Sequence, residues 1–273
     1  MKKNLINGRF LTNREGYRRL LSIGISALLS VSTFLTVIPQ TATTVYADND
    51  KTITGLCTGA IGNPTSGAGG WSKVYYGAYG SSAMLYRVLT TSTTDFGGST
   101  MLLDCDNTII NKRFDDDKSN EWANSEIKSW LNGGDFYGNA NVFTAQEKAA
   151  IASSTKASAA TGDGDGCAGD LGYALGYAPL AGELVFLLDA VEATRPSYGY
   201  ANTHGSDGNR SKSGTDGYWW LRSPNSSDGF RAGYVDNTKA KGDIFSNGVS
   251  ISYGVSPALN LDLESVIFSS VVS

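Results

Sequence analysis

The two residues of this sequence best suited to ligand chemistry are Trp220 and Arg222, in the stretch GYWWLRSPNSSDGF of residues 217–230. An indole ring stacks on apolar faces of sugars or peptides, and a guanidinium group donates paired hydrogen bonds to oxygen acceptors. If the stretch is a β-strand, Trp219 points to one face and Trp220 and Arg222 to the other. One interpretation is a binding platform for a sugar or peptide. The other is a framework strand with both indoles in the core and Arg222 bonded to carbonyls or a carboxylate. We expect the framework role for Trp219 and Arg222, and both interpretations stay open for Trp220.

The loop after this strand has a composition suited to recognition. Pro224 lacks an N–H and ends the ladder of strand hydrogen bonds, and residues 225–229 are small and polar, as turns require. Loops on a rigid sheet often carry binding residues. We therefore expect alanine at both Asn225 and Asp228 to weaken binding while thermal stability stays nearly unchanged. The predicted ligand-binding residues are Trp220, Arg222, Asn225, Asp228, Arg231 and Tyr234.

Patterns for catalysis and metal binding are weak. His204 is the only histidine and no Cys-x-x-Cys pair occurs, which argues against zinc sites. No spacing singles out a pair of carboxylates for glycoside hydrolysis. Calcium prefers several oxygen ligands, and the loop TGDGDGCAGD offers Asp163, Asp165 and Asp170, although without the spacing of an EF-hand. These aspartates are weak calcium candidates; otherwise we expect no cofactor and no catalytic residue.

The N-terminal segment is typical of a secretory signal peptide. A basic stretch precedes the apolar residues 20–38, and the VYA of residues 45–47 resembles a cleavage site. An uncleaved membrane anchor is the alternative. Residues 1–47 hold six Lys/Arg and one Glu, so that residues 48–273 carry 16 basic against 25 acidic residues, a net charge of −9. This charge disfavours nucleic acid, whose phosphates need a basic surface. We expect a secreted or cell-surface protein without nucleic-acid partners and without membrane insertion after cleavage.

The remaining chain is long enough for one large domain. The Gly/Thr/Ser-rich residues 48–70 predict a flexible N-terminal segment, and residues 71–268 a single globular domain. Three cysteines permit at most one intrachain disulfide, with three pairings open. Because one cysteine must stay unpaired within the chain, we expect the fold not to depend on a bridge.

Strand patterns dominate the chain, with two helical patterns between them. Ile127, Trp130 and Leu131 fall on one face of a helix, so we expect Trp130 in the core. Thr144 and Glu147 have the spacing of a capping box at the start of a second helix. Alternating or apolar segments predict strands at residues 71–79, 84–90, 99–105, 183–189, 218–223, 230–236, 242–247 and 254–263.

Seven segments occur in an order that resembles a known family: WSKVYYGAY, LYRVL, WANSEIKSWLN, FTAQEKAAI, VFLLDAVEA, WWLRSP and GVSPALNLDL. The chain is similar, over about residues 70–268, to secreted Firmicutes domains of unknown function with a Trp-Trp-Leu-Arg-Ser-Pro signature. Two residues depart from the family pattern. Tyr86 stands where the family usually has Trp, and Ser256 stands where it usually has Arg. If that arginine pairs with a buried acid, the pair is missing here.

The late segments of the family also resemble the formylglycine-generating-enzyme branch of C-type-lectin-like folds, which implies a related architecture. We therefore predict a loop-rich α+β domain, C-type-lectin-like or sulfatase-modifying-factor-like, with mostly antiparallel short strands and two or more short helices. The expected function is a binding or adhesion module for an extracellular glycan or surface protein. The alternatives are an enzyme of carbohydrate or cell-envelope metabolism and a structural module of a larger surface protein.

Overall fold

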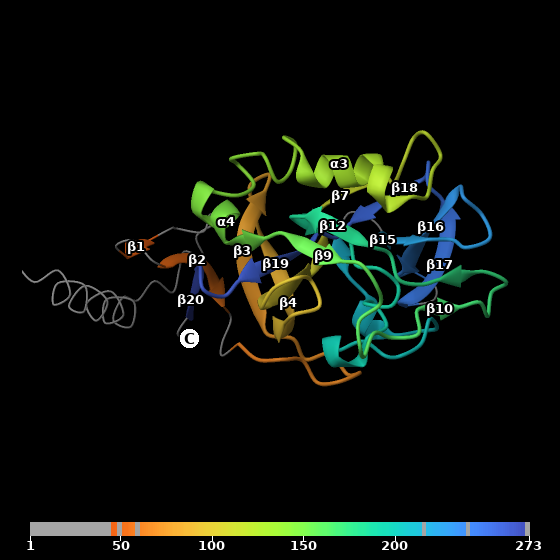
Figure 1. The fold of residues 1–273 in the computed structure, drawn as a ribbon, viewed down its shortest axis with the longest axis horizontal. Coiled ribbons are helices and arrows are strands. Elements are labelled where there is room, and N and C mark those ends of the chain that lie inside the picture. Colours follow the sequence, from red (N-terminus) through yellow and green to blue (C-terminus); the bar gives the residue numbers. More distant parts are fainter. Residues whose placement is uncertain (1–44, 48–50, 58–60, 215–216, 239–240, 271–273) are drawn as a thin grey trace, which may run out of the picture.

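The computed structural model describes residues 45–47, 51–57, 61–214, 217–238 and 241–270. Within these ranges two β-sheets follow one another along the long axis, with the short α-helices on one side and long loops on the other (Figure 1). The predicted signal peptide lies outside the described residues except for its last three. Neither α-helix of the described ranges is long and apolar enough to cross a membrane.

The larger sheet is curled and mainly antiparallel, and it contains the strands predicted at residues 71–79, 84–90 and 99–105 as β3, β4 and β5. Its path in the described chain is β1-β2-β3-β4-β5-β19-β13, with β20 parallel to β2 and β8 beside β19. The bounds are β1 Val45–Ala47, β2 Lys51–Cys57, β3 Lys73–Tyr79, β4 Ser82–Thr93, β5 Thr100–Cys105, β8 Ile151–Ala152, β13 Val185–Phe186, β19 Ala258–Asp262 and β20 Val266–Ser270.

The smaller sheet has the order β17-β16-β15-β18-β7, with only β15 and β18 parallel. The last predicted strand, residues 254–263, is in fact divided between two sheets, because Pro257 lacks an N–H to continue a ladder. The segment therefore joins the two sheets through β18 and β19. The bounds are β7 Ile110–Arg113, β15 Tyr218–Pro224, β16 Arg231–Asp236, β17 Asp243–Gly248 and β18 Ser252–Val255.

Short strand pairs and single turns of 3₁₀-helix hold the long loops in place. They satisfy backbone groups that would otherwise be buried without a partner. The pairs are β6 Asn107–Thr108 with β14 Ser213–Gly214, β9 Ser154–Lys156 with β12 Leu180–Glu183, and β10 Cys167–Ala168 with β11 Ala174–Leu175. The 3₁₀ turns are η1 Trp122–Asn124, η2 Pro196–Tyr198 and η3 Gly208–Arg210.

Both predicted helices form where their capping residues place them. In α3 (Glu126–Asn132) the Ser125 hydroxyl accepts the backbone N–H of Lys128, and in α4 (Ala145–Ala150) Thr144 and Glu147 form the predicted capping box. The face assignment of α3 is wrong in one respect. Ile127 and Leu131 are buried, but Trp130 is only half-buried at the edge of the core.

The prediction of an α+β domain with a C-type-lectin-like or sulfatase-modifying-factor-like architecture is wrong. Strands in two sheets dominate the described residues, and their only α-helices are α3 and α4. The helical patterns are present, but they are short: α3 ends at Gly133 after seven residues and α4 has six. Such helices cannot form a layer of their own, so they only cover the edge of a mainly β fold.

Candidate functional site

The strand with the Trp-Trp-Leu-Arg-Ser-Pro sequence, β15, is buried on both faces. Trp219, Trp220 and Arg222 are all 0 % exposed. The indole N–H of Trp219 donates to the carbonyl of Arg210 at 3.1 Å, and that of Trp220 donates to the carbonyl of Lys112 at 2.9 Å. Because every polar group of the two indoles has a protein partner, both belong to the framework of the domain.

Arg222 is the centre of a buried ionic cluster. Its guanidinium group donates to both carboxylate oxygens of Glu192 at 2.6 and 2.8 Å and to Asp189 at 2.9 Å. It also donates to the carbonyls of Ala178 and Leu187. Lys156 supplies a second cation, 3.0 Å from Glu192. The guanidinium group therefore has no free donor to offer a ligand.

The two acids of this cluster also cap each other's backbone, with the capping-box spacing. The Asp189 carboxylate accepts the N–H of Glu192, and the Glu192 carboxylate accepts the N–H of Asp189. Burial raises the pKa of Asp189 to about 6, against the opposing charge of Arg222. Burial acts in the same direction on Glu192, but the charges of Arg222 and Lys156 outweigh it and lower the pKa of Glu192 to about 2.

A second buried cluster accounts for the residue at which this chain departs from the family pattern. Asp104, fully buried on β5, lies beside Ser256, the position that usually holds arginine. Its cation here is Lys212, whose ammonium is 2.6 Å from both Asp104 oxygens and 2.6 Å from the Ser256 hydroxyl. The acid is thus paired in this chain, by a residue from a different loop. Burial lowers the pKa of Lys212, and Asp104 opposes that shift.

The loop after β15 separates the predicted contact residues into two kinds. Asn225 is 5 % exposed, and its side chain donates to the Ser246 hydroxyl and accepts the N–H groups of Ser227 and Asp228. The side chains of Asp228 and Arg231 are 42 % and 46 % exposed and lie 3.6 Å apart. Asn225 therefore holds the loop together, whereas Asp228 and Arg231 are available at the surface.

The burial and hydrogen bonds of Asn225 correct the expectation that alanine at both Asn225 and Asp228 leaves stability nearly unchanged: the two replacements should differ in their effects. Asn225→Ala leaves two backbone N–H groups and a buried hydroxyl without a partner and should cost about 2–4 kcal/mol. Asp228→Ala removes only contacts of a half-exposed carboxylate and should lower the free energy of unfolding by about 1 kcal/mol or less. Urea denaturation of the two single variants measures both values. Equal losses would mean that the turn does not depend on the Asn225 amide.

Tyr234, the last predicted contact residue, lies in a group of rings on the outer face of the smaller sheet, most of them half-buried and one, Tyr253, only 8 % exposed. We call Tyr218, Tyr234, Phe245 and Tyr253 the tyrosine platform. Tyr218 and Tyr253 stack at 4.9 Å between centroids, and Tyr234 lies 4.9 Å from Tyr253 and 6.2 Å from Phe245. The buried indole of Trp220 packs against it, 4.8 Å from Tyr253. Two predicted residues therefore meet here: Tyr234 as a member of the platform and Trp220 as its buried neighbour on the same face.

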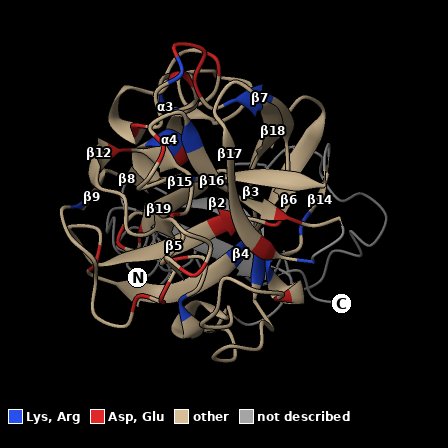
Figure 2. Cartoon of the chain, turned by 90° about the vertical axis from the view of Figure 1, so that its right-hand side faces the viewer, with Lys and Arg blue, Asp and Glu red and all other residues tan. Residues whose placement is uncertain are grey.

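Strand register explains why these rings meet. Trp220 is opposite Tyr234, and Tyr234 is opposite Phe245, so all three side chains point to the same face. Burial, with the neighbouring Tyr253 and Asp236, raises the pKa of Tyr234, so its phenol stays neutral. In Figure 2 strands β16 and β17 are tan over most of their length, and the charges around them are of both signs. The rings of the platform are thus uncharged, and the acids Asp236 and Asp243 lie at one end of it, opposite Tyr218 in the strand register.

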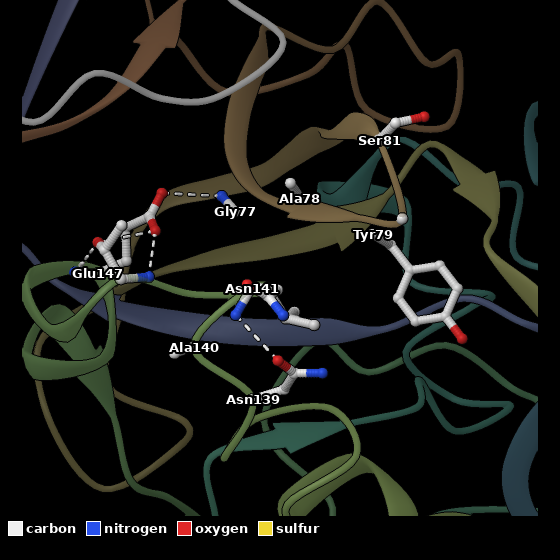
Figure 3. Close-up of a pocket in the computed structure, with 11 residues that line it drawn as sticks. Gly77, Ala78, Tyr79, Ser81, Asn139, Ala140, Asn141 and Glu147 are labelled. Carbon is white, nitrogen blue, oxygen red and sulfur yellow. Dashed lines mark hydrogen bonds between the residues drawn. The ribbon is translucent and has the colours of Figure 1, made fainter.

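A polar groove lies between the turn that joins β3 to β4 and the loop that precedes α4. It has a volume of about 550 Å³ and is lined by residues 77–81, 139–142, 144 and 147. Glu147 is the only charged residue among them, and its oxygens accept the N–H of Gly77, the N–H of Thr144 and the Thr144 hydroxyl (Figure 3). Glu147 therefore connects α4 to β3 and is not a free acid.

Gly77 is essential to the geometry of the groove. Its φ is +63°, in the left-handed region, and a Cβ atom there would lie 2.6 Å from the Phe143 ring and 2.7 Å from the carbonyl of Val142. This close approach lets Ala78 donate its N–H to the same carbonyl at 2.8 Å. No sequence pattern predicted the groove, although Gly77 interrupts an alternating strand and so marks a bulge.

The calcium candidates do not come together. Asp163 is paired with Lys156 at 2.9 Å and Arg195 at 3.2 Å, whereas Asp170 is 69 % exposed and lies 3.4 Å from His204. Asp165 is exposed. Among the described residues no group of three or more His, Cys, Asp or Glu side chains is arranged to hold a metal ion. Cys105 and Cys167 are buried free thiols.

Fold and site together define a mainly β domain with buried ionic clusters inside and an aromatic face outside. The chain belongs to a family described as a domain of unknown function, DUF6273, which matches residues 97–263. The match includes β15, both buried clusters and the whole tyrosine platform, and it begins after the β3–β4 hairpin. No curated protein and no solved structure matches the chain.

Proposed function

We propose that this protein is a secreted or cell-surface module that binds a saccharide on the tyrosine platform. The observation that carries the proposal is the group of neighbouring rings on a rigid sheet face, in which Tyr218, Tyr234 and Phe245 are partly accessible and Tyr253 is buried between them. Aromatic rings present large apolar surfaces with a polar tip, which suits the apolar faces and hydroxyl groups of sugars. The signal-peptide pattern and the resemblance to secreted Firmicutes domains support an extracellular location.

The arrangement of the acids supports binding rather than hydrolysis. A glycoside hydrolase needs two carboxyl groups that flank the bond to be cleaved. Asp189 and Glu192 are 0 % exposed and bonded to Arg222. Glu147, in the groove, has both oxygens occupied by hydrogen bonds. None of these carboxyl groups is free to reach a substrate.

A saccharide-binding measurement with matched aromatic variants tests the proposal. The full-length protein is titrated calorimetrically with soluble β-linked oligomers of glucose and of N-acetylglucosamine. Tyr234→Ala should weaken binding at least about tenfold, because about 1.4 kcal/mol of stacking and burial is lost. Tyr234→Phe, which keeps the ring, should retain most of the affinity.

Phe230→Ala provides the control. Phe230 is 64 % exposed, and none of the ring contacts in the described chain involves it, so its loss should leave the affinity unchanged. Failure of every oligomer to bind, or equal affinity of Tyr234→Ala and the wild type, would refute the proposal. Binding of a proline-rich peptide in place of the oligomers, on the same tyrosines, would refute the saccharide assignment.

A further inference from the structure

Partly exposed side chains continue the tyrosine platform toward the groove. Lys112 on β7 is opposite Tyr253 on β18, so both side chains lie on the outer face of the sheet. The Lys112 ammonium lies 4.9 Å from the Trp130 ring centre, and Trp130 meets Tyr79 edge to face at 6.2 Å. Each member of this series touches or faces the next, from Tyr253 to Tyr79.

Tyr79 is where this series enters the groove. It is the only aromatic residue that lines the groove, and Figure 3 shows its ring at one end with Glu147 at the other. Between them lie Asn139 and Asn141, with neutral amide groups, and Ser81 also lines the groove, at the turn next to Tyr79. The amide oxygen of Asn139 accepts the N–H of Asn141. The groove thus offers one ring and several neutral hydrogen-bonding groups.

We propose that the tyrosine platform, Lys112, Trp130, Tyr79 and the groove form one continuous track for an extended saccharide chain; this rests on the proposed function. The four strand intervals from β17 to β7 alone span about 19 Å at ~4.8 Å each. This width exceeds a single sugar ring, and Trp130 and the groove lengthen it further. The ligand class is therefore an oligomer or polymer rather than a monosaccharide.

The hydrogen bonds already made by the outer edge of β17 argue against an extended peptide as the ligand. A peptide that adds a strand needs unpaired backbone groups at a sheet edge. At the outer edge of β17, Ile244 donates its N–H to the carbonyl of His204 at 2.7 Å, and Ser246 donates to the Tyr173 hydroxyl at 3.1 Å. Strand addition at β17 is thus blocked, whereas rings and neutral amides remain accessible along the face.

Dependence of affinity on chain length tests the track. Oligomers of two to about six units, from the series that binds the platform, are titrated against the wild type and against Tyr79→Ala, Lys112→Ala and Tyr234→Ala. In the wild type the longest oligomer should bind at least about tenfold more tightly than the shortest. In Tyr79→Ala and Lys112→Ala the shortest oligomer should bind as in the wild type, and most of the gain with length should be lost. In Tyr234→Ala binding should weaken at every length.

The outcomes separate this inference from the proposed function. If short oligomers bind the platform but affinity does not rise with length, or rises equally in Tyr79→Ala, the track is refuted and the platform stands. If no oligomer binds, both are refuted. Lys112 and Tyr79 are half-buried surface residues, so the melting temperatures of Tyr79→Ala and Lys112→Ala should be close to that of the wild type. If Tyr79→Ala nevertheless proves unstable, Lys112→Ala alone still tests the track.

Discussion

Replacement of Arg222 by methionine should destabilise the protein by about 3–5 kcal/mol, because it leaves buried carboxylates without their main cation. Glu192 and Asp189 are 0 % exposed, and Lys156 alone cannot replace the paired hydrogen bonds that the guanidinium group makes with Glu192. Methionine keeps much of the side-chain volume, so the loss reports charge and hydrogen bonds rather than a cavity. Chemical denaturation at neutral pH measures the effect.

Two further measurements identify the ionic origin of this loss. Asp189→Asn added to Arg222→Met removes one of the unpaired charges and should recover part of the stability. Arg231→Met removes a 46 % exposed side chain near Asp228 and should change stability by about 0.5 kcal/mol or less. A loss in Arg222→Met no larger than in Arg231→Met would mean that the buried cluster contributes nothing to the fold.

The pH dependence of the variant has an expected sign. In the wild type the lowered pKa of Glu192, about 2, stabilises the fold above the unfolded value of 4.5, and this contribution is lost as pH falls from 4.5 toward 2. Without Arg222, burial dominates and raises the pKa of Glu192, as it already does for Asp189. A group whose pKa is raised on folding loses stability as pH rises, so the deficit of Arg222→Met should be smaller at pH 5 than at pH 8.

Local sequence patterns predicted the elements of the fold better than their assembly. The strands β3, β4, β5, β15, β16 and β17 and the capping box of α4 follow from residue types a few positions apart. The fold class could not be predicted in this way. It depends on how the two sheets join through Pro257, and the two short helices, although predicted as short, were given more weight in the fold class than their length allows.

In the candidate site, too, local patterns predicted single side chains better than the contacts between them. The alternation in β15 predicted that Trp219 and Trp220 point to opposite faces, but not that both faces are covered. The pairing of Lys212 with Asp104 links residues 108 positions apart, and no spacing pattern detects it. The tyrosine platform also needs the register of four strands, since its rings come from β15, β16, β17 and β18. Tyr234 was predicted because it follows the loop, not because of its partners.

The assignment of β15 to the framework leads to the second large expected effect. Trp219→Ala should cost about 3–5 kcal/mol, as truncations of large buried aromatic residues do. Trp219 is 0 % exposed, its indole donates to the carbonyl of Arg210, and the Lys212 ammonium lies 4.1 Å from its ring centre. Its loss therefore opens a cavity and also removes a neighbour of the Lys212–Asp104 pair.

Trp130→Ala is the matched control, because it removes the same side chain from a half-buried position on α3. It should cost less than Trp219→Ala in denaturant titrations, and Trp219→Phe should recover part of the loss by filling part of the cavity. Saccharide titration of whatever fraction of Trp219→Ala remains folded should give the wild-type affinity, since this ring faces the interior and the platform lies on the opposite side of the sheet. If instead Trp219→Ala keeps its stability and loses saccharide binding, the buried indole must contact the ligand, and the framework role of β15 is refuted.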